Sequence, residues 1–119
     1  VDSFSVAGMN DHITPWDAVY RSTLLLGGDR RFVLSNSGHV QSILNPPSNP
    51  KAAYVENAKM SSDPRAWYYD AKHVDGSWWP QWLEWIQQRS GAQHETSFTL
   101  GNPNYPPMEA APGTYVRVR

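Results

Sequence analysis

Two residues in the first third of the sequence have the types and the placement for acid–base chemistry. Asp11 follows an alternating, strand-like run at residues 1–8, and His39 follows a short apolar run at residues 32–34. An ionised aspartate that holds one imidazole nitrogen as N–H leaves the other nitrogen free to act as a base. If their loops meet in space, Asp11 and His39 can therefore serve as the acid and the base of a nucleophilic site.

The nucleophile that such a pair would serve is absent from these residues. The sequence contains no cysteine and neither a G-x-S-x-G nor a G-x-C-x-G motif. Ser35 and Ser37 lie near His39, but in no strand-to-helix turn that would expose a nucleophile. The chain thus contains two thirds of a triad, in the order that α/β-hydrolases use after an upstream nucleophile. The alternative stays open that the two residues are ordinary loop residues, because a triad is recognised by its geometry and not by sequence position.

Residues 1–39 are expected to form the frame that positions this pair. The opening strand is followed by a helical pattern with Thr14 as N-cap and Pro15 as first helical residue, and glycines at 27–28 end the helix. The apolar run at 32–34 indicates a second, buried strand. This order predicts a βαβ unit with parallel strands in an α/β sheet, in which both loops leave the same carboxyl edge.

Residues 40–92 are expected to be irregular and helical. A short helix is predicted at 40–44, a second opens at 63–64, and a stronger helix over 78–89 has Ser77 as its N-cap. From residue 93 to residue 119 the chain is polar and proline-rich without a helical period. This tail is expected to run extended over another surface.

The strongest predicted helix is rich in tryptophan. Trp78, Trp82 and Trp85 share one face, with Trp79, Leu83 and Ile86 beside it. Aromatic stripes at helical spacing usually belong to a core, which is the favoured interpretation. The alternative is an amphipathic surface that touches a polymer or a granule.

Composition restricts the partners and the class of site. With 10 Lys+Arg against 11 Asp+Glu in 119 residues, the net charge of -1 argues against nucleic acid or an anionic membrane as partner. There is no apolar run long enough for a membrane span, and the start at Val1 and Asp2 lacks the features of a signal peptide. We expect an excised piece that begins inside a sheet. Asp11, His12 and His39 are not expected to bind a metal because adjacent residues have poor ligand spacing.

Several blocks of this sequence resemble the polyhydroxyalkanoate synthases, and together they extend over nearly the whole chain. They are residues 10–16 (NDHITPW), 32–47 (FVLSNSGHVQSILNPP), 49–51 (NPK), 77–79 (SWW) and 111–116 (APGTYV). The chain is similar to the C-terminal part of the catalytic domain of that family. The resemblance implies an α/β-hydrolase fold, of which residues 1–119 would form the C-terminal portion.

The resemblance also implies an activity and roles for the two residues. Members polymerise (R)-3-hydroxyacyl-CoA into polyester and release CoA through a Cys-His-Asp triad. Asp11 matches the catalytic acid and His39 the catalytic base, whereas the cysteine lies upstream of this segment. Asp11 would orient His39 or help to activate the 3-hydroxyl of the incoming monomer. Without the upstream cysteine, the isolated segment is expected to be inactive.

Partners, cofactors and location follow from the same resemblance. The implied partners are the acyl-CoA substrate, the growing polyester, the rest of the catalytic domain, a granule surface in the cytoplasm and a second copy of the enzyme. No cofactor is implied. Arg30 and Arg31 can meet CoA phosphates or form a solvated turn, and the turn is favoured. Residues 109–116 resemble the synthases that take monomers of medium length.

Two other functions stay open at the level of sequence. One is a different α/β-hydrolase, such as an esterase or depolymerase, which would have an upstream serine instead of a cysteine. The other is a granule-binding or assembly module built on the tryptophan-rich helix. His12 can line the site or pack in its loop, and His73 and His94 are expected to be surface residues.

Overall fold

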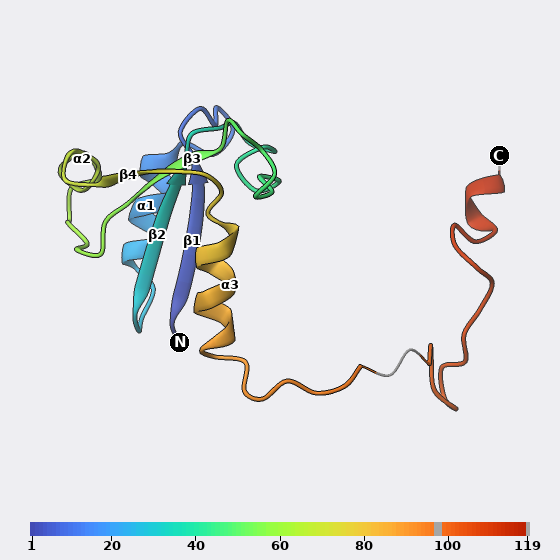
Figure 1. Ribbon diagram of the computed structural model, residues 1–119. Coiled ribbons are helices and arrows are strands. Elements are labelled where there is room, and N and C mark those ends of the chain that lie inside the picture. The colour runs from blue at the N-terminus through green and yellow to red at the C-terminus, as the bar shows by residue number, and fades with distance from the viewer. Residues whose placement is uncertain (97–98, 119) are drawn as a thin grey trace.

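The computed structural model describes residues 1–96 and 99–118, which form an α/β unit followed by a tail (Figure 1). Four strands form a sheet in the order β1-β2-β3-β4. They are β1 (Ser3–Gly8), β2 (Arg30–Ser35), β3 (Ala53–Glu56) and β4 (Lys72–Asp75). The helices are α1 (Trp16–Leu24), α2 (Pro64–Tyr69), α3 (Trp79–Gln87) and the short 3₁₀ turn η1 (Tyr115–Arg117).

The first part of the chain is the predicted βαβ unit. Strands β1 and β2 pair in parallel over their whole length, from Ser3 opposite Arg30 to Gly8 opposite Ser35. The register puts the carboxyl ends of both strands at one edge of the sheet. Beyond β2 the sheet departs from the prediction, because β3 and β4 were not expected and both pair antiparallel. The sheet is therefore mixed.

Residues 32–35 of β2 are buried because both faces of the strand are covered there. Phe32 and Leu34 point into a core that also contains Tyr20 of α1 and Trp67 of α2. Val33, between them, points to the opposite face and packs with Tyr54 of β3 and with Trp78, the residue before α3. The alternation of side chains along a strand thus produces two cores from one apolar run. Figure 1 shows α1 and α3 on opposite sides of the sheet.

Three aromatic side chains pack against one another in the larger core. The ring of Tyr20 lies 5.0 Å from that of Phe32 and 5.2 Å from that of Trp67, and Phe32 and Trp67 are 5.1 Å apart. Two of the three pairs meet edge to face, which suits the charge distribution of aromatic rings. The Tyr20 hydroxyl donates to the Ser61 carbonyl at 2.8 Å and accepts from the Ser61 N–H at 2.9 Å. Burial raises the pKa of this hydroxyl.

Three local predictions are corrected by the structure. Residues 40–44 form turns and no helix, with the N–H groups of Ile43 and Leu44 both donated to the Val40 carbonyl. Thr14 does not cap α1, because its hydroxyl donates to Asp11 instead and the helix begins at Trp16 after Pro15. The helix also ends earlier than its apolar stripe suggests, at Leu24.

The other two helices lie close to their predicted positions. Asp63 caps α2, because its carboxylate accepts the Arg65 N–H at 3.1 Å. Helix α3 begins one residue later than predicted, and the Ser77 hydroxyl accepts the Trp79 N–H at 3.0 Å. The expectation of a buried tryptophan face is only partly met. Trp78 is buried, whereas Trp82 and Leu83 are 40% and 49% exposed.

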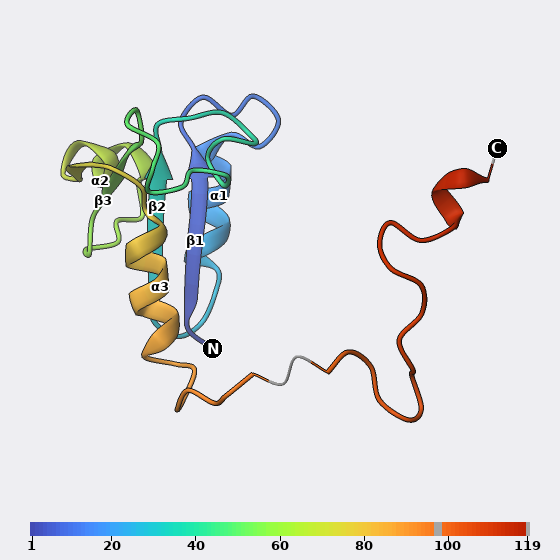
Figure 2. The same cartoon turned by 45° about the vertical axis from the view of Figure 1, so that its right-hand side comes forward.

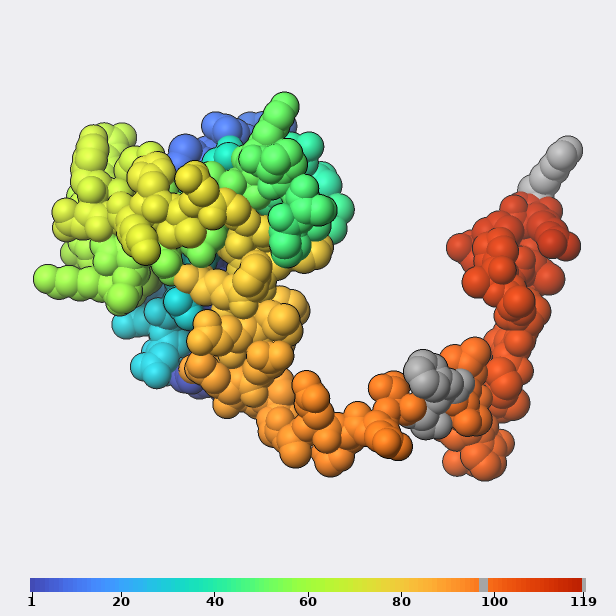
Figure 3. Space-filling view, viewed as in Figure 1, coloured from blue at the N-terminus to red at the C-terminus, as the bar shows by residue number. Residues whose placement is uncertain are grey.

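The tail after α3 extends away from the α/β unit (Figures 1 and 2). In the space-filling view it stands clear of the body (Figure 3). Residues 97, 98 and 119 of the predicted tail lie outside the described part of the chain. No helix among the described residues is long and apolar enough to cross a membrane.

Candidate functional site

The loops after β1 and β2 meet at the carboxyl edge of the parallel pair. Asp11 lies three residues after the end of β1, and His39 four residues after the end of β2. Backbone hydrogen bonds join the loops: the Met9 N–H donates to the Ser35 carbonyl at 2.8 Å and the Asn10 N–H to the Ser37 carbonyl at 3.2 Å. Adjacent strands lie about 4.8 Å apart, so side chains on these loops are within reach of each other.

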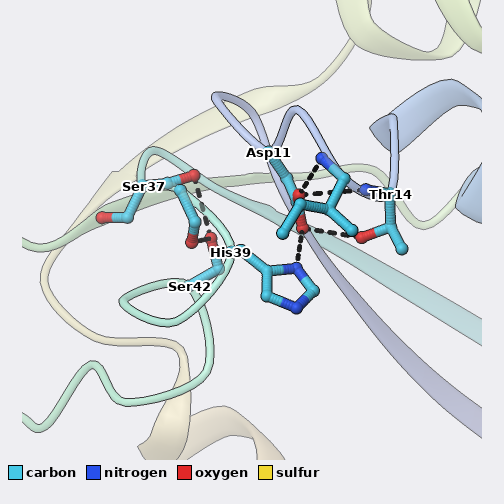
Figure 4. A network of polar contacts seen from close by, with 7 residues as sticks. Asp11, Thr14, Ser37, His39 and Ser42 are labelled. Atoms are coloured by element: carbon cyan, nitrogen blue, oxygen red, sulfur yellow. Dashed lines mark hydrogen bonds and ion pairs between the residues drawn. The ribbon is translucent and has the colours of Figure 1, made fainter.

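Asp11 and His39 are in direct contact, as the sequence predicted (Figure 4). The Asp11 Oδ2 lies 2.8 Å from the His39 Nδ1. The Asp11 side chain is 6% exposed, whereas that of His39 is 47% exposed. A buried acid thus holds one side of a ring whose other side is open.

Asp11 also organises its own loop. Its Oδ1 accepts the backbone N–H groups of Ile13 at 2.9 Å and Thr14 at 3.0 Å, and its Oδ2 accepts the Thr14 hydroxyl at 2.6 Å. The Thr14 hydroxyl is the main cause that holds the pKa of Asp11 well below its usual value. The Thr14 N–H and the contacts with His39 and Ile13 act in the same direction, and desolvation opposes them. The carboxylate therefore stays ionised and can only accept hydrogen bonds.

The ionised carboxylate decides which nitrogen of His39 can act as a base. Because Asp11 accepts at Nδ1, that nitrogen carries the hydrogen of the neutral ring, and Nε2 is left with its lone pair. In Figure 4 the ring turns Nδ1 toward Asp11 and its other nitrogen away. This is the arrangement of acid and base in triad enzymes.

Ser42 and Gly8 hold the loop that carries His39 close to the end of β1. The Ser42 hydroxyl lies within hydrogen-bond distance of two carbonyls that precede the histidine, at 2.9 Å from Ser37 and 2.7 Å from Gly38. A Cβ atom at Gly8 would lie 2.3 Å from the Ser42 Oγ and 2.7 Å from the Ser37 carbonyl oxygen. The close approach of the loop to the end of β1 thus requires glycine.

Asn36 supports the same loop from its other side. Its amide donates to the Lys51 carbonyl at 3.0 Å, and its carbonyl oxygen accepts the Ala53 N–H at 3.4 Å. Asn10 adds a link between the two loops by donating to the Asn36 carbonyl at 3.0 Å. Asn36 and Asn10 therefore tie the His39 loop to the start of β3 and to the loop after β1.

The two serines nearest to His39 have other partners. The Ser37 hydroxyl donates to the Asn36 Oδ1 at 3.3 Å. Ser35 is fully buried and lies 3.4 Å from the Asn45 amide. Within the described residues, neither serine makes a hydrogen bond to His39, so neither is placed as a nucleophile.

The remaining candidates lie away from the pair or on the surface. Arg30 and Arg31 occupy the amino end of β2, roughly 17 Å along the strand from its carboxyl end. His12, His73 and His94 are exposed. In the described part of the chain there is no group of three or more histidine, cysteine, aspartate or glutamate residues that could hold a metal ion.

Thr14 and Ser42 are the site residues whose roles sequence reasoning missed. Aspartate side chains often accept hydrogen bonds from residues two or three positions further along the chain. The spacing of Asp11 and Thr14 in the sequence could therefore have predicted their contact. Ser42 had no such signal, since its partners lie in a loop whose course depends on the packing over Gly8.

Comparison with known proteins shows which family the chain belongs to. The sheet and the site define an α/β unit with a hydrogen-bonded Asp–His pair at the carboxyl ends of its parallel strands. No family model matches the chain. It is 70% identical over its whole length to poly(3-hydroxyalkanoate) polymerase 2 of Ectopseudomonas oleovorans, and 54% identical over 99% of its length to polymerase 1 of that organism.

The similarity reaches other bacteria. The chain is 38% identical over its whole length to a poly(3-hydroxyalkanoate) polymerase subunit of Cupriavidus necator. The chain belongs to the poly(3-hydroxyalkanoate) polymerase family, also called polyhydroxyalkanoate synthases. It spans about a fifth of the length of these relatives, 21% of the first two and 20% of the third.

Proposed function

We propose that this chain supplies the acid and the base of an enzyme that polymerises (R)-3-hydroxyacyl-CoA into polyester and releases CoA. The single observation that carries the proposal is the 2.8 Å contact between the Asp11 Oδ2 and the His39 Nδ1, at the carboxyl ends of two parallel strands. The names of the relatives supply the polymer. An α/β-hydrolase fold for the whole catalytic domain is part of the proposal, supported by the parallel pair and by the order of acid and histidine.

The first step is activation of a nucleophile that lies outside this chain. His39 takes the proton of an upstream cysteine thiol at its Nε2, and the thiolate attacks the thioester carbonyl of the substrate. The bond between the acyl carbon and the CoA sulfur breaks, and CoA leaves as a thiol with the proton from His39. The acyl group stays on the cysteine as a thioester.

Chain growth repeats the same proton transfer on an alcohol. A 3-hydroxyl group loses its proton to His39 and attacks a cysteine-bound acyl carbon. An ester forms, the bond between the acyl carbon and the cysteine sulfur breaks, and the sulfur leaves as a thiol with the proton from His39. Asp11 stabilises the imidazolium that forms in each step, because its carboxylate remains ionised. The exposed side of the His39 ring leaves room for both the thiol and the alcohol to approach.

Location and partners belong to the same proposal. A product that is an insoluble polyester places the enzyme at the surface of a cytoplasmic granule. Exposed Leu83 and partly exposed Ile86, one turn apart on α3, form an apolar surface of the kind that contacts polymer or another protein.

The test replaces His39 in the whole polymerase. His39→Ala is expected to lower the rate of CoA release by about 10³-fold or more, since a residue that acts as the general base cannot be bypassed. His73→Ala, at an exposed histidine of β4, is the matched control and should keep its rate. Normal CoA release by His39→Ala would exclude the proposed role. The residue at the upstream elbow, cysteine or serine, separates a synthase from an esterase or depolymerase.

A further inference from the structure

Three consecutive side chains at the start of α3 donate hydrogen bonds to the loop that follows His39. The Trp78 Nε1 donates to the Ser42 carbonyl at 2.8 Å, and the Trp79 Nε1 donates to the Ile43 carbonyl at 2.9 Å. The Ser77 hydroxyl donates to the Asn45 carbonyl. More than thirty residues of chain separate the donors from their acceptors, and residues 77–79 are here called the Ser-Trp-Trp clamp.

Packing against neighbouring side chains holds the central tryptophan of the clamp in one orientation. Trp78 is 7% exposed and packs with Val33 and Tyr54, and its ring lies 6.1 Å from that of Phe4. An indole held in this way keeps its N–H pointed in one direction. Its acceptor is also inside the protein, because Ser42 is only 1% exposed. Leaving a buried carbonyl without its donor costs more free energy than losing the same hydrogen bond at the surface.

The residue held by Trp78 is the one that supports His39. The carbonyl of Ser42 accepts from Trp78, while its hydroxyl lies 2.9 Å from the Ser37 carbonyl and 2.7 Å from the Gly38 carbonyl. Figure 4 shows Ser42 beside the loop that carries the histidine. A continuous path thus runs from the core at Trp78 through Ser42 to the peptide groups next to His39.

The imidazole has little else to hold it in place. Its side chain is 47% exposed, and the described hydrogen bond of the ring is the one with Asp11. The orientation of the base therefore depends on where its backbone is placed. A displacement of about 1 Å at a reacting group can cost about 10²-fold in rate.

We propose that the Ser-Trp-Trp clamp, and Trp78 above all, is a positioning device that sets the His39 loop against Asp11. Trp78 touches no reacting atom; it acts through Ser42. This inference rests on the proposed function, because it assigns Trp78 to the support of a base.

The first test compares two tryptophans in the whole polymerase. Trp78→Phe keeps an aromatic ring but removes the N–H. Trp82→Phe is the matched control, because Trp82 is 40% exposed and none of the side-chain hydrogen bonds described in the structure involves it. We expect Trp78→Phe to lower kcat about tenfold with KM within about twofold, and Trp82→Phe to change both by less than about twofold.

The same variants are followed by hydrogen exchange at residues 38–45. The N–H of Ser42 donates to the Gly38 carbonyl and that of Leu44 to the Val40 carbonyl, so these amides report on the loop. Trp78→Phe is expected to speed their exchange about fivefold, the effect of one neutral hydrogen bond. Trp82→Phe should leave exchange in this segment unchanged. Unchanged kcat in Trp78→Phe overturns the positioning role, whatever the exchange rates show.

A second test asks whether Trp78 acts through the catalytic pair. If it only aligns His39 with Asp11, Trp78→Phe should cost less than about twofold in kcat once Asp11→Asn has already broken that contact. A full tenfold cost in both backgrounds would place its effect elsewhere and overturn the inference. Should Trp78→Phe fail to fold, Ser42→Ala breaks the same path at its other end and should show the same coupling to Asp11.

The two proposals fail in different ways. A polymerase that stays active without His39 rejects the proposed function. A polymerase that requires His39 and keeps full kcat in Trp78→Phe rejects the clamp alone.

Discussion

The two carboxylate oxygens of Asp11 accept hydrogen bonds from different groups. Its Oδ1 accepts the N–H groups that turn the chain toward α1, and its Oδ2 is shared by the Thr14 hydroxyl and the His39 ring. An asparagine at this position keeps the shape of the side chain, but its amide nitrogen has no lone pair for the second pair of donors. The loop and the His39 ring are therefore coupled through a single carboxylate.

The ionisation of Asp11 predicts how acid affects the protein. Hydrogen bonds from Thr14 hold the folded-state pKa of Asp11 well below the ordinary value of about 3.9. For a lowered pKa, the stabilising effect is complete above the ordinary value and is lost as the pH falls below it toward the folded one. We expect wild-type polymerase to unfold at a higher temperature than Asp11→Asn throughout the range from pH 7 to about pH 5. The margin should shrink below about pH 4.

Thermal unfolding of both proteins across this range, followed by circular dichroism, checks the prediction. A margin that already narrows between pH 7 and pH 5 would mean that Asp11 is protonated in the folded state at moderate pH. In that case the carboxylate could not stabilise an imidazolium during catalysis.

At the scale of elements, the site depends on how closely the His39 loop approaches β1. Gly8→Ala places a methyl group on the Ser42 hydroxyl and the Ser37 carbonyl, so the loop must move. We expect a loss of about 1–3 kcal/mol in the free energy of unfolding together with lower activity. Gly27→Ala is the control, since a Cβ there meets nothing within 4 Å and its φ is not positive. Equal stability and rates in the two variants, measured by denaturant unfolding and CoA release, would contradict this account.

Helix α1 is tied to the loop before α2 by one hydroxyl. Tyr20→Phe leaves both the N–H and the carbonyl of Ser61 without their partner in a site where Tyr20 is fully buried. We expect a loss of about 1–3 kcal/mol in the free energy of unfolding. Tyr69→Phe, at an 82% exposed tyrosine of α2, should change it by less than about 0.5 kcal/mol. Denaturant titration measures both, and a loss of the same size in Tyr69→Phe would point to a nonspecific effect.

What the sequence predicted and what it missed follow from the range of the interactions. The parallel pair of β1 and β2 and the meeting of Asp11 with His39 were predictable, because a strand-helix-strand order largely determines the geometry. Strands β3 and β4 were missed because each has four residues, too few to show a period. The turns at 40–44 were mistaken for a helix, since their apolar residues have helical spacing but lie exposed.

The helix cap predicted at Thr14 shows the same limit of prediction from sequence. Thr14 has the type and position of an N-cap, but the Asp11 carboxylate is a stronger acceptor than any local group and takes its hydroxyl. The two tryptophans at the start of α3, Trp78 and Trp79, were predictable as apolar residues. Their indole hydrogen bonds to Ser42 and Ile43 were not, because those depend on a packing contact between distant parts of the chain.

At the scale of the whole molecule, the chain is more extended than an independent domain of its length. Its radius of gyration is 18.9 Å, against about 13.5 Å for a compact domain of 119 residues. The difference comes from the tail, which leaves the α/β unit after α3 (Figure 2). The end of α3 itself is held, because Arg89 donates to the Asp2 carboxylate at 2.8 Å and 3.1 Å.

The tail carries apolar side chains that a soluble surface does not normally expose together. Leu100, Tyr105, Met108 and Tyr115 are each at least 76% exposed. The described hydrogen bonds of residues 102–118 join tail residues to one another, such as Asn102 with Tyr105 and Glu109 with Thr114. Since the chain spans a fifth of its relatives, we expect the rest of the polymerase to cover this surface.

Proteolysis tests whether the tail is covered. In the isolated chain, chymotrypsin should cut first at Leu100 and Tyr115, because an exposed, unpacked backbone enters a protease site without unfolding. Phe32 in β2 should resist, since cutting there requires the sheet to open. In the whole polymerase the two tail sites should be cut at least about tenfold more slowly. Mass spectrometry of timed digests measures this, with Tyr115→Ser identifying the fragments. Equal rates in both proteins would show that the tail is free in the enzyme and that its apolar residues serve a partner outside the polymerase.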